Sequence, residues 1–210
     1  MIARSLANFM SGVVIATMPA YATSFTTSGL PAILRGAGTY GLLMSSYTVG
    51  NIVGAAIAGK FQDKPLGKTI MFGLILSLVC WIIAISASSL LVTVVFIALT
   101  FTPSSIIGIQ IAATIQAVPP ERFVGRISSL NGSATHALIP IGSIAGGTIA
   151  SKFSPKIAMY SYVLGPAIYV LFVVLRSDLR QLPRPDEISG TPPRSKHSDG
   201  RITSSYRRRT

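Results

Sequence analysis

The sequence predicts an all-α, polytopic membrane protein with six transmembrane helices and a disordered, basic C-terminal tail. Half of the 210 residues are hydrophobic and only 11% are charged, whereas ~25% are charged in an ordinary soluble domain. The mean hydropathy is +0.59. Only two of the six acidic residues precede Leu175. A water-soluble globule could not cover its surface with so few charges, so the composition excludes a cytosolic enzyme, a disulfide-rich secreted module and a disordered chain.

Uncharged runs that are long enough to cross a bilayer define the spans. A hydrocarbon core of ~30 Å needs about 20 helical residues. These runs lack the alternating pattern of a membrane β-barrel, and lipid offers the backbone no hydrogen bonds, so helices are expected. The predicted bundle covers residues 1–176, with spans near 6–25, 36–59, 69–87, 90–117, 127–151 and 157–175.

The first two spans come from the charge-free stretches nearest the N-terminus. Arg4 followed by an apolar run also resembles a secretory signal peptide, but five further spans favour a retained helix. In the second span, Gly50, Gly54 and Ala58 are four residues apart. They therefore share one helix face, along which another helix can approach closely.

The remaining four spans follow from the position of small, polar and proline residues. The uncharged run at 69–120 fits two crossings, with a break expected at 86–89. Pro103 should kink the fourth helix, because proline removes a backbone hydrogen bond. The fifth span carries further small residues for helix packing, namely Gly142, Gly146 and Gly147. The sixth span is the uncharged run at 157–175.

The distribution of Lys and Arg predicts the orientation in the membrane. With the six predicted spans, one side collects 15 of the 18 basic residues and the other side collects Arg35, Lys152 and Lys156. Basic loops favour the cytoplasmic side. We therefore expect a multi-pass plasma membrane protein with both termini in the cytoplasm.

The C-terminal segment, residues 177–210, differs in composition from the bundle. It contains eight of the basic residues, four prolines and several serines. Such a segment cannot bury apolar surface and is expected to be disordered. It would serve either as a solvated topology anchor or as a contact for anionic lipid.

Two connections and their order among the spans carry a resemblance to a known family. The second connection, 59–68, places Asp63 among lysines, and the fourth, 118–126, contains Pro119, Glu121, Arg122, Gly125 and Arg126. This order resembles the C-terminal half of a major facilitator superfamily transporter, closest to the bacterial drug and siderophore efflux branch. The resemblance implies that the six spans match the seventh to twelfth helices of that fold.

The second connection is a candidate conformational latch. An acid at a helix N-terminus accepts backbone hydrogen bonds and meets the positive end of the helix dipole. The resemblance implies that such an acid reaches across to the other half of the transporter. The loop departs from the family pattern by one residue, and the alternative is a basic loop that only sets topology. The latch candidates are Gly59, Asp63, Lys64, Gly67 and Lys68.

Polar side chains within the spans are candidates for a substrate path, since polar groups are costly in lipid. His136 could carry a proton, because histidine titrates near neutral pH. The alternative for each residue is hydrogen bonding between helices. The candidates are Asn8, Tyr40, Tyr47, Asn51, Gln110, Thr114 and His136.

Together these features predict secondary transport, with efflux of a small apolar or amphipathic molecule by alternating access. The expected partners are membrane lipid, the substrate and a second six-helix half, which would be a homodimer mate, a separate chain or a missing N-terminal portion. The absence of a catalytic set or metal-ligand cluster in the sequence predicts no enzyme, no cofactor, no metal and no nucleic-acid partner. The alternative is a non-transporting six-helix assembly or regulatory subunit.

Overall fold

The computed structural model describes residues 2–25, 36–62, 64–117, 125–126, 129, 132–133 and 136–175. Within these ranges the regular elements are all helical and no strand occurs, which confirms the predicted all-α class. The elements are α1 (Ile2–Ala22), α2 (Ala37–Ile57), the 3-10 helix η2 (Ala58–Phe61), α3 (Leu66–Ser86), α4 (Leu90–Ala117), α6 (Leu138–Lys152), α7 (Pro155–Ser161) and α8 (Leu164–Leu175).

Four helical segments of the described chain are long and apolar enough to cross a membrane. They are Ala37–Phe61, Leu66–Ser86, Leu90–Ala113 and Pro155–Leu175. Apolar side chains such as Phe72 and Leu91 remain exposed on the outside of the bundle. Such faces suit a hydrocarbon environment, where the helical backbone satisfies its own hydrogen bonds. The chain is therefore an all-α polytopic membrane protein, as predicted.

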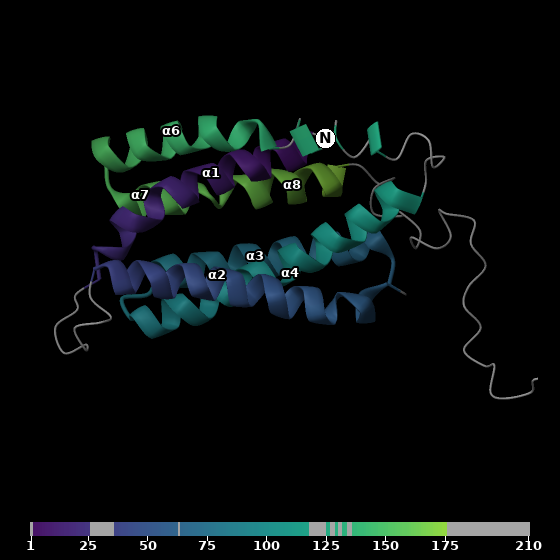
Figure 1. Cartoon of the computed structure of the whole chain (residues 1–210), viewed down its shortest axis with the longest axis horizontal. Coiled ribbons are helices and arrows are strands. Elements are labelled where there is room, and N and C mark those ends of the chain that lie inside the picture. Colours follow the sequence, from purple (N-terminus) through teal and green to yellow (C-terminus); the bar gives the residue numbers. More distant parts are fainter. Residues whose placement is uncertain are drawn as a thin grey trace, which may run out of the picture.

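The helices run in alternating directions along the bundle, except that α8 continues in the direction of α7 (Figure 1). The starts of α1, α3 and α6 lie at the same end of the bundle as the ends of α2, α4 and α8. We call this the basic end, because the connection between α2 and α3 there carries Lys60, Lys64 and Lys68. The α6–α7 connection at the opposite end has Lys152 and Lys156 beside it.

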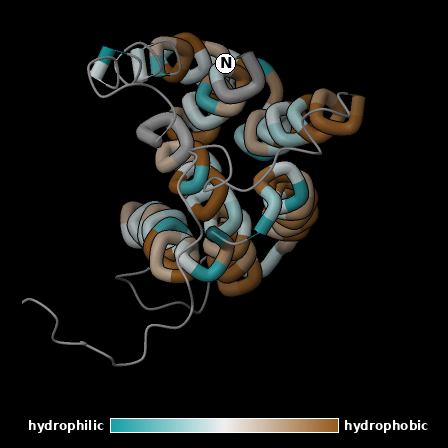
Figure 2. Tube along the Cα trace, turned by 90° about the vertical axis from the view of Figure 1, so that its right-hand side faces the viewer, coloured by the Kyte–Doolittle hydropathy of each residue, from teal (hydrophilic) through white to brown (hydrophobic). Residues whose placement is uncertain are grey.

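The helices form two groups, α1 with α6, α7 and α8, and α2 with α3 and α4 (Figures 1 and 2). Within the groups, α1 packs along α6, while α4 packs along both α2 and α3. A core of fully buried side chains, including Met18, Leu43, Trp81, Ile97 and Met159, draws on both groups. The Trp81 indole Nε1 donates a hydrogen bond of 2.9 Å to the Met159 carbonyl and so links α3 to α7.

Small residues set how closely the helices approach. A side-chain carbon added at Gly142 would overlap the backbone of Phe9 on α1, and one added at Gly50 would overlap Ala98 on α4. Neither helix pair could approach this closely with a larger residue, because the partner atoms are backbone and cannot rotate away. Lipid provides no hydrophobic driving force between helices, so close van der Waals contact stabilises these interfaces.

The predicted sixth span is divided into α7 and α8. Pro166 has no backbone N–H, so the Tyr162 carbonyl cannot accept the regular α-helical bond from it. Instead, the Gly165 N–H donates to the Tyr162 carbonyl at 3.1 Å, and the Val163 N–H donates to the Tyr160 carbonyl at 3.0 Å. This tight turn at Tyr162 and Val163 separates α7 from α8. The predicted span at 157–175 did not include this turn, although Pro166 was the available signal.

Several predicted segments fall wholly or partly outside the described residues. The tail at 177–210 does so entirely, and most of 127–135 does so within the predicted fifth span. The described part of that span is α6, from Leu138, together with a few helical residues before it.

Candidate functional site

A cavity of about 250 Å³ lies between the two helix groups. We call it the central cavity, and its walls come from α1, α2, α3, α4, α8 and Tyr162 of the α7–α8 turn. Because one helix group forms each side, a change in the packing of the two groups would change its shape.

Polar side chains occupy the wall formed by α1, α2 and the middle of α3 and α4. They are Asn8, Ser11, Tyr47, Asn51, Ser77 and Ser104. The Ser11 hydroxyl donates to the Ala7 carbonyl at 3.0 Å, and the Ser77 hydroxyl donates to the Thr100 carbonyl at 2.7 Å. A hydroxyl that has donated its single proton retains acceptor capacity. These serines therefore offer the cavity hydrogen-bond acceptors.

Asn51 differs from the serines because its amide both donates and accepts. One amide N–H bonds the Tyr47 carbonyl at 2.9 Å, one turn earlier in α2. The second amide hydrogen and the amide oxygen of the same side chain can still donate to and accept from a ligand. The Asn51 backbone carbonyl meanwhile accepts from the Ser105 hydroxyl at 2.9 Å, which anchors this part of α2 to α4. The amide is thus held by a fixed stretch of backbone.

Aromatic rings form another wall of the cavity. The Tyr47 and Phe101 rings meet edge to face with centroids 4.5 Å apart, and Phe101 lies 6.2 Å from Tyr162. Behind them, the fully buried Trp81 ring lies 4.5 Å from that of Tyr162. Such edge and tilted contacts stabilise aromatic clusters beyond simple burial. This wall is therefore a packed aromatic cluster, with the buried Trp81 ring behind it.

The central cavity is amphipathic and carries no formal charge. None of its lining residues is acidic, basic or histidine. A charged ligand group would lose its hydration here without an ion partner, which is costly. The geometry therefore suits a small neutral or amphipathic molecule, with one polar group on Asn51 and its apolar part on the rings.

Three of the seven predicted path residues line this cavity together: Asn8, Tyr47 and Asn51. Tyr40 instead packs against the hydrophobic core. Gln110 is buried, and its Nε2 donates to the Phe61 carbonyl at 2.7 Å, linking α4 to η2. His136 is exposed and is not among the lining residues. The side chain of Thr114 lies outside the described residues.

The sequence pattern did not predict the other hydroxyl-bearing and aromatic residues of the cavity wall, which are Ser11, Ser77, Phe101, Ser104, Tyr162 and Tyr169. Serine is small and common in membrane helices, so a single serine gives little signal. Phe101 and Tyr162 read as ordinary apolar span residues. The only available cue was Ser104, directly after Pro103, where a helix was expected to bend.

The candidate latch loop is described in part. Gly59, Lys64 and Lys68 are exposed, Gly67 is buried, and Asp63 lies outside the described residues. The N-cap of α3 is Pro65, without a side-chain cap. The role of Asp63 therefore stays a prediction.

The fourth connection is described only at its end. Gly125 and Arg126 are exposed and helical. Pro119, Glu121 and Arg122 lie outside the described residues.

The predicted packing glycines differ among themselves. Gly50 and Gly54 lie against α4, and Gly142 and Gly146 lie against α1. Gly147 is exposed, and an added side-chain carbon there would meet nothing within 4 Å. Gly147 is therefore not at a helix contact in this structure.

Comparison with known proteins identifies one family. The family model described as Major Facilitator Superfamily matches residues 1–209. Among curated proteins, no relative matches the chain.

Proposed function

The chain belongs to the Major Facilitator Superfamily, a family of membrane transporters, and from this we propose that it exports a small apolar or amphipathic compound. The observation that carries the proposal is the central cavity. Its uncharged lining pairs Asn8 and Asn51 with the rings of Tyr47, Phe101 and Tyr162. Such a lining would discriminate by shape and by a few hydrogen bonds, as small-molecule pockets do.

The transport mechanism we propose is alternating access with a second six-helix half. Transporters of this kind bind substrate near the membrane midplane, at the interface of two repeats that rock against each other. The side chains of Ile52 on α2 and Ile144 on α6 are 62% and 72% exposed. These apolar faces support a partner, which would be a second copy, a separate chain or a further portion of the same protein. In the assembly, the loop from Gly59 to Lys68 would act as the latch.

The location we propose is the plasma membrane, with the basic end in the cytoplasm. The α2–α3 connection with its lysines shares one end of the bundle with the start of α1 and the end of α8 (Figure 1). This placement supports a single cytoplasmic face that contains both ends of the bundle.

The test is a flux assay in sealed vesicles. Vesicles containing the chain together with a complementing half, or as a dimer, should take up neutral lipophilic fluorescent dyes with saturable kinetics. Vesicles with verified monomer should show no saturable flux. Matched vesicles without protein give the passive rate. Saturable flux by the monomer would contradict the need for a second half, and its absence from every assembly would favour a non-transporting subunit.

A further inference from the structure

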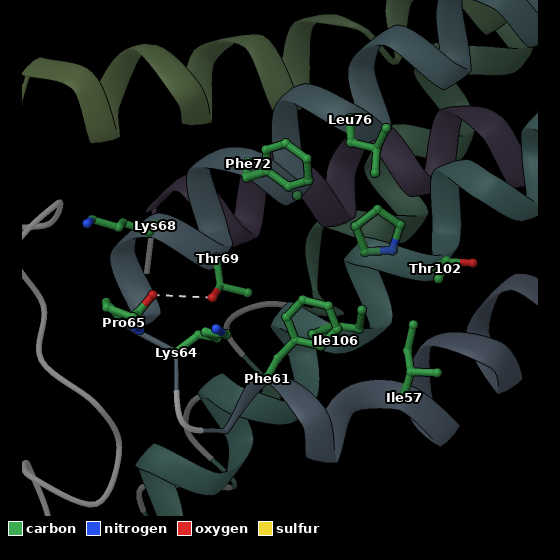
Figure 3. A pocket seen from close by; sticks show the side chains of 12 residues that line it. Ile57, Phe61, Lys64, Pro65, Lys68, Thr69, Phe72, Leu76, Thr102 and Ile106 are labelled. Carbon is green, nitrogen blue, oxygen red and sulfur yellow. Dashed lines mark hydrogen bonds between the residues drawn. The ribbon is translucent and has the colours of Figure 1, made fainter.

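A second cavity, of about 360 Å³, opens at the basic end of the bundle between η2, α3 and α4 (Figure 3). We call it the lateral cavity. Its walls include Phe61 of η2, Phe72 and Leu76 of α3, and Pro103 and Ile106 of α4. It shares no lining residue with the central cavity. It is therefore separate from the central cavity.

The polar groups of the lateral cavity leave one kind of donor for a ligand. The Thr69 hydroxyl donates to the Pro65 carbonyl at 3.2 Å, as drawn in Figure 3. The Thr102 hydroxyl donates to the Ala98 carbonyl at 2.9 Å. Both protons are thus used within the bundle, and the charged donors that remain are the ammonium groups of Lys64 and Lys68. No acidic residue is among the lining residues.

The depth of these groups matches the layers of a membrane leaflet. Lys64 lies between the candidate spans Ala37–Phe61 and Leu66–Ser86, and Lys68 lies in the first turn of the second span. The ends of two successive spans are expected at the level of the lipid headgroups. Leu76 follows Lys68 by eight residues, or roughly 12 Å of helix. The ring of Phe72, between them, is 70% exposed. The cavity therefore has cations at headgroup depth and an apolar wall beneath them.

We propose that the lateral cavity binds one anionic phospholipid, with its phosphate beside Lys64 and Lys68 and an acyl chain against Phe72 and Leu76. Charge complementarity selects this occupant. A second copy of the chain would bring a surface of the same sign, since the net charge is +12 and only two acidic residues precede Leu175. A water-soluble anion would leave the apolar wall unfilled. The proposal does not depend on transport.

The experiment measures lipid binding to the purified full-length chain in neutral detergent. Native mass spectrometry would follow titrations with dioleoylphosphatidylglycerol, which is anionic, and dioleoylphosphatidylcholine, which is zwitterionic. The wild-type chain should bind one phosphatidylglycerol more tightly than phosphatidylcholine. The double substitution Lys64→Gln/Lys68→Gln should weaken phosphatidylglycerol binding about 30-fold, because each basic residue at an anionic lipid contributes a factor of about five.

Two matched controls make the result specific. Lys152→Gln/Lys156→Gln removes two exposed lysines beside the opposite end of the bundle and should leave binding unchanged. Leu76→Trp should fill the cavity and displace the lipid, whereas Ile75→Trp should not. Leu76 and Ile75 are adjacent and similarly exposed, at 41% and 43%, but only Leu76 lines the cavity.

Three outcomes would overturn the proposal. One is wild-type affinity for phosphatidylglycerol in Lys64→Gln/Lys68→Gln. Another is equal affinity of the wild-type chain for the two lipids. The third is that Lys64→Gln/Lys68→Gln or Leu76→Trp leaves lipid binding unchanged but removes a second copy of the chain from the assembly. That result would assign this surface to a protein interface. The Leu76→Trp and Ile75→Trp pair tests the same site if the double lysine variant fails to fold.

Discussion

At the residue scale, a buried hydrogen bond holds the ring that lies behind the aromatic wall of the central cavity. Trp81 supports the aromatic wall, and its Nε1 donates to the Met159 carbonyl at 2.9 Å across the two helix groups. The Met159 carbonyl also accepts from the Tyr162 N–H at 3.3 Å, so the indole bond contributes the roughly 0.5–1.5 kcal/mol that is typical of one intramolecular hydrogen bond. The same two helices share a second contact, between the hydroxyls of Ser86 and Tyr160 at 2.9 Å, but this pair is exposed.

Trp81→Phe should lower the free energy of unfolding by about 1–3 kcal/mol, because it removes one buried hydrogen bond and leaves part of the space of the fully buried indole ring unfilled. The measurement is denaturant unfolding in detergent micelles. Ser86→Ala is the control, and we expect a change within about 0.5 kcal/mol, since it removes an exposed bond between the same helices. Equal effects of the two substitutions would show that burial of the Trp81 bond does not matter.

Asn51→Leu should raise the KM for a polar-headed amphipathic dye about 10-fold or more in a transporting assembly. The reason is that leucine removes the amide that donates and accepts at the cavity wall, worth about 1.5 kcal/mol for one neutral hydrogen bond. Dye flux at varied concentration gives the KM. Thr48→Val on the same helix is the control, because Thr48 is exposed and does not line the cavity. An unchanged KM in Asn51→Leu would show that Asn51 contributes to helix packing and not to substrate binding.

At the scale of the elements, the glycines divide by what lies opposite them. On α6, Gly142 is buried against the Phe9 backbone of α1, while Gly147 faces open space. The two residues are five positions apart, so they point to different sides of the helix. Both positions hold glycine in the same helix, and only the atoms that surround them differ. A substitution at each therefore isolates the effect of helix contact.

Gly142→Ala should destabilise the chain by about 1–3 kcal/mol, because the added methyl group overlaps backbone atoms that can yield only by separating α1 from α6. Gly147→Ala should be neutral or stabilising by up to about 1 kcal/mol, since alanine is the better helix former. Thermal unfolding in one detergent compares the two variants. A loss of stability of similar size in both would mean that the interface with α1 is not the cause.

At the scale of the whole molecule, alternating helix directions bring the lysines of the α2–α3 connection to one end (Figure 1). The connection between α6 and α7 lies at the other end. Phe153 in that connection is 71% exposed, and Gln62 beside η2 is exposed as well. The only cysteine, Cys80, is buried. The two exposed positions can therefore report which side of the membrane each end occupies.

Phe153→Cys should react with a membrane-impermeant maleimide added to intact cells, and Gln62→Cys should react only after permeabilisation. The expected orientation follows from the preference of basic loops for the cytoplasm. The wild-type chain with buried Cys80 is the background control. The reverse labelling pattern would invert the proposed topology, and labelling of both positions from outside would contradict it altogether.

The amino-acid sequence by itself determined the all-α membrane class and the charge asymmetry of the two ends. These properties depend on local composition: an apolar run must be helical in lipid, and each basic residue acts near its own loop. For the same reason, the apolar and small-residue pattern pointed to Gly50 and Gly142 as close contacts. The break at Tyr162 was also encoded locally, in Pro166, but was overlooked.

Only the tertiary structure decided which of the polar side chains meet. Asn8, Asn51 and Ser77 converge because α1, α2 and α3 pack around one cavity, while Gln110 turns to the Phe61 carbonyl instead. A contact such as Trp81 to Met159 joins residues 78 positions apart. Its existence depends on how the two helix groups dock, and docking is set by the shapes of many side chains together rather than by the spacing of any one motif.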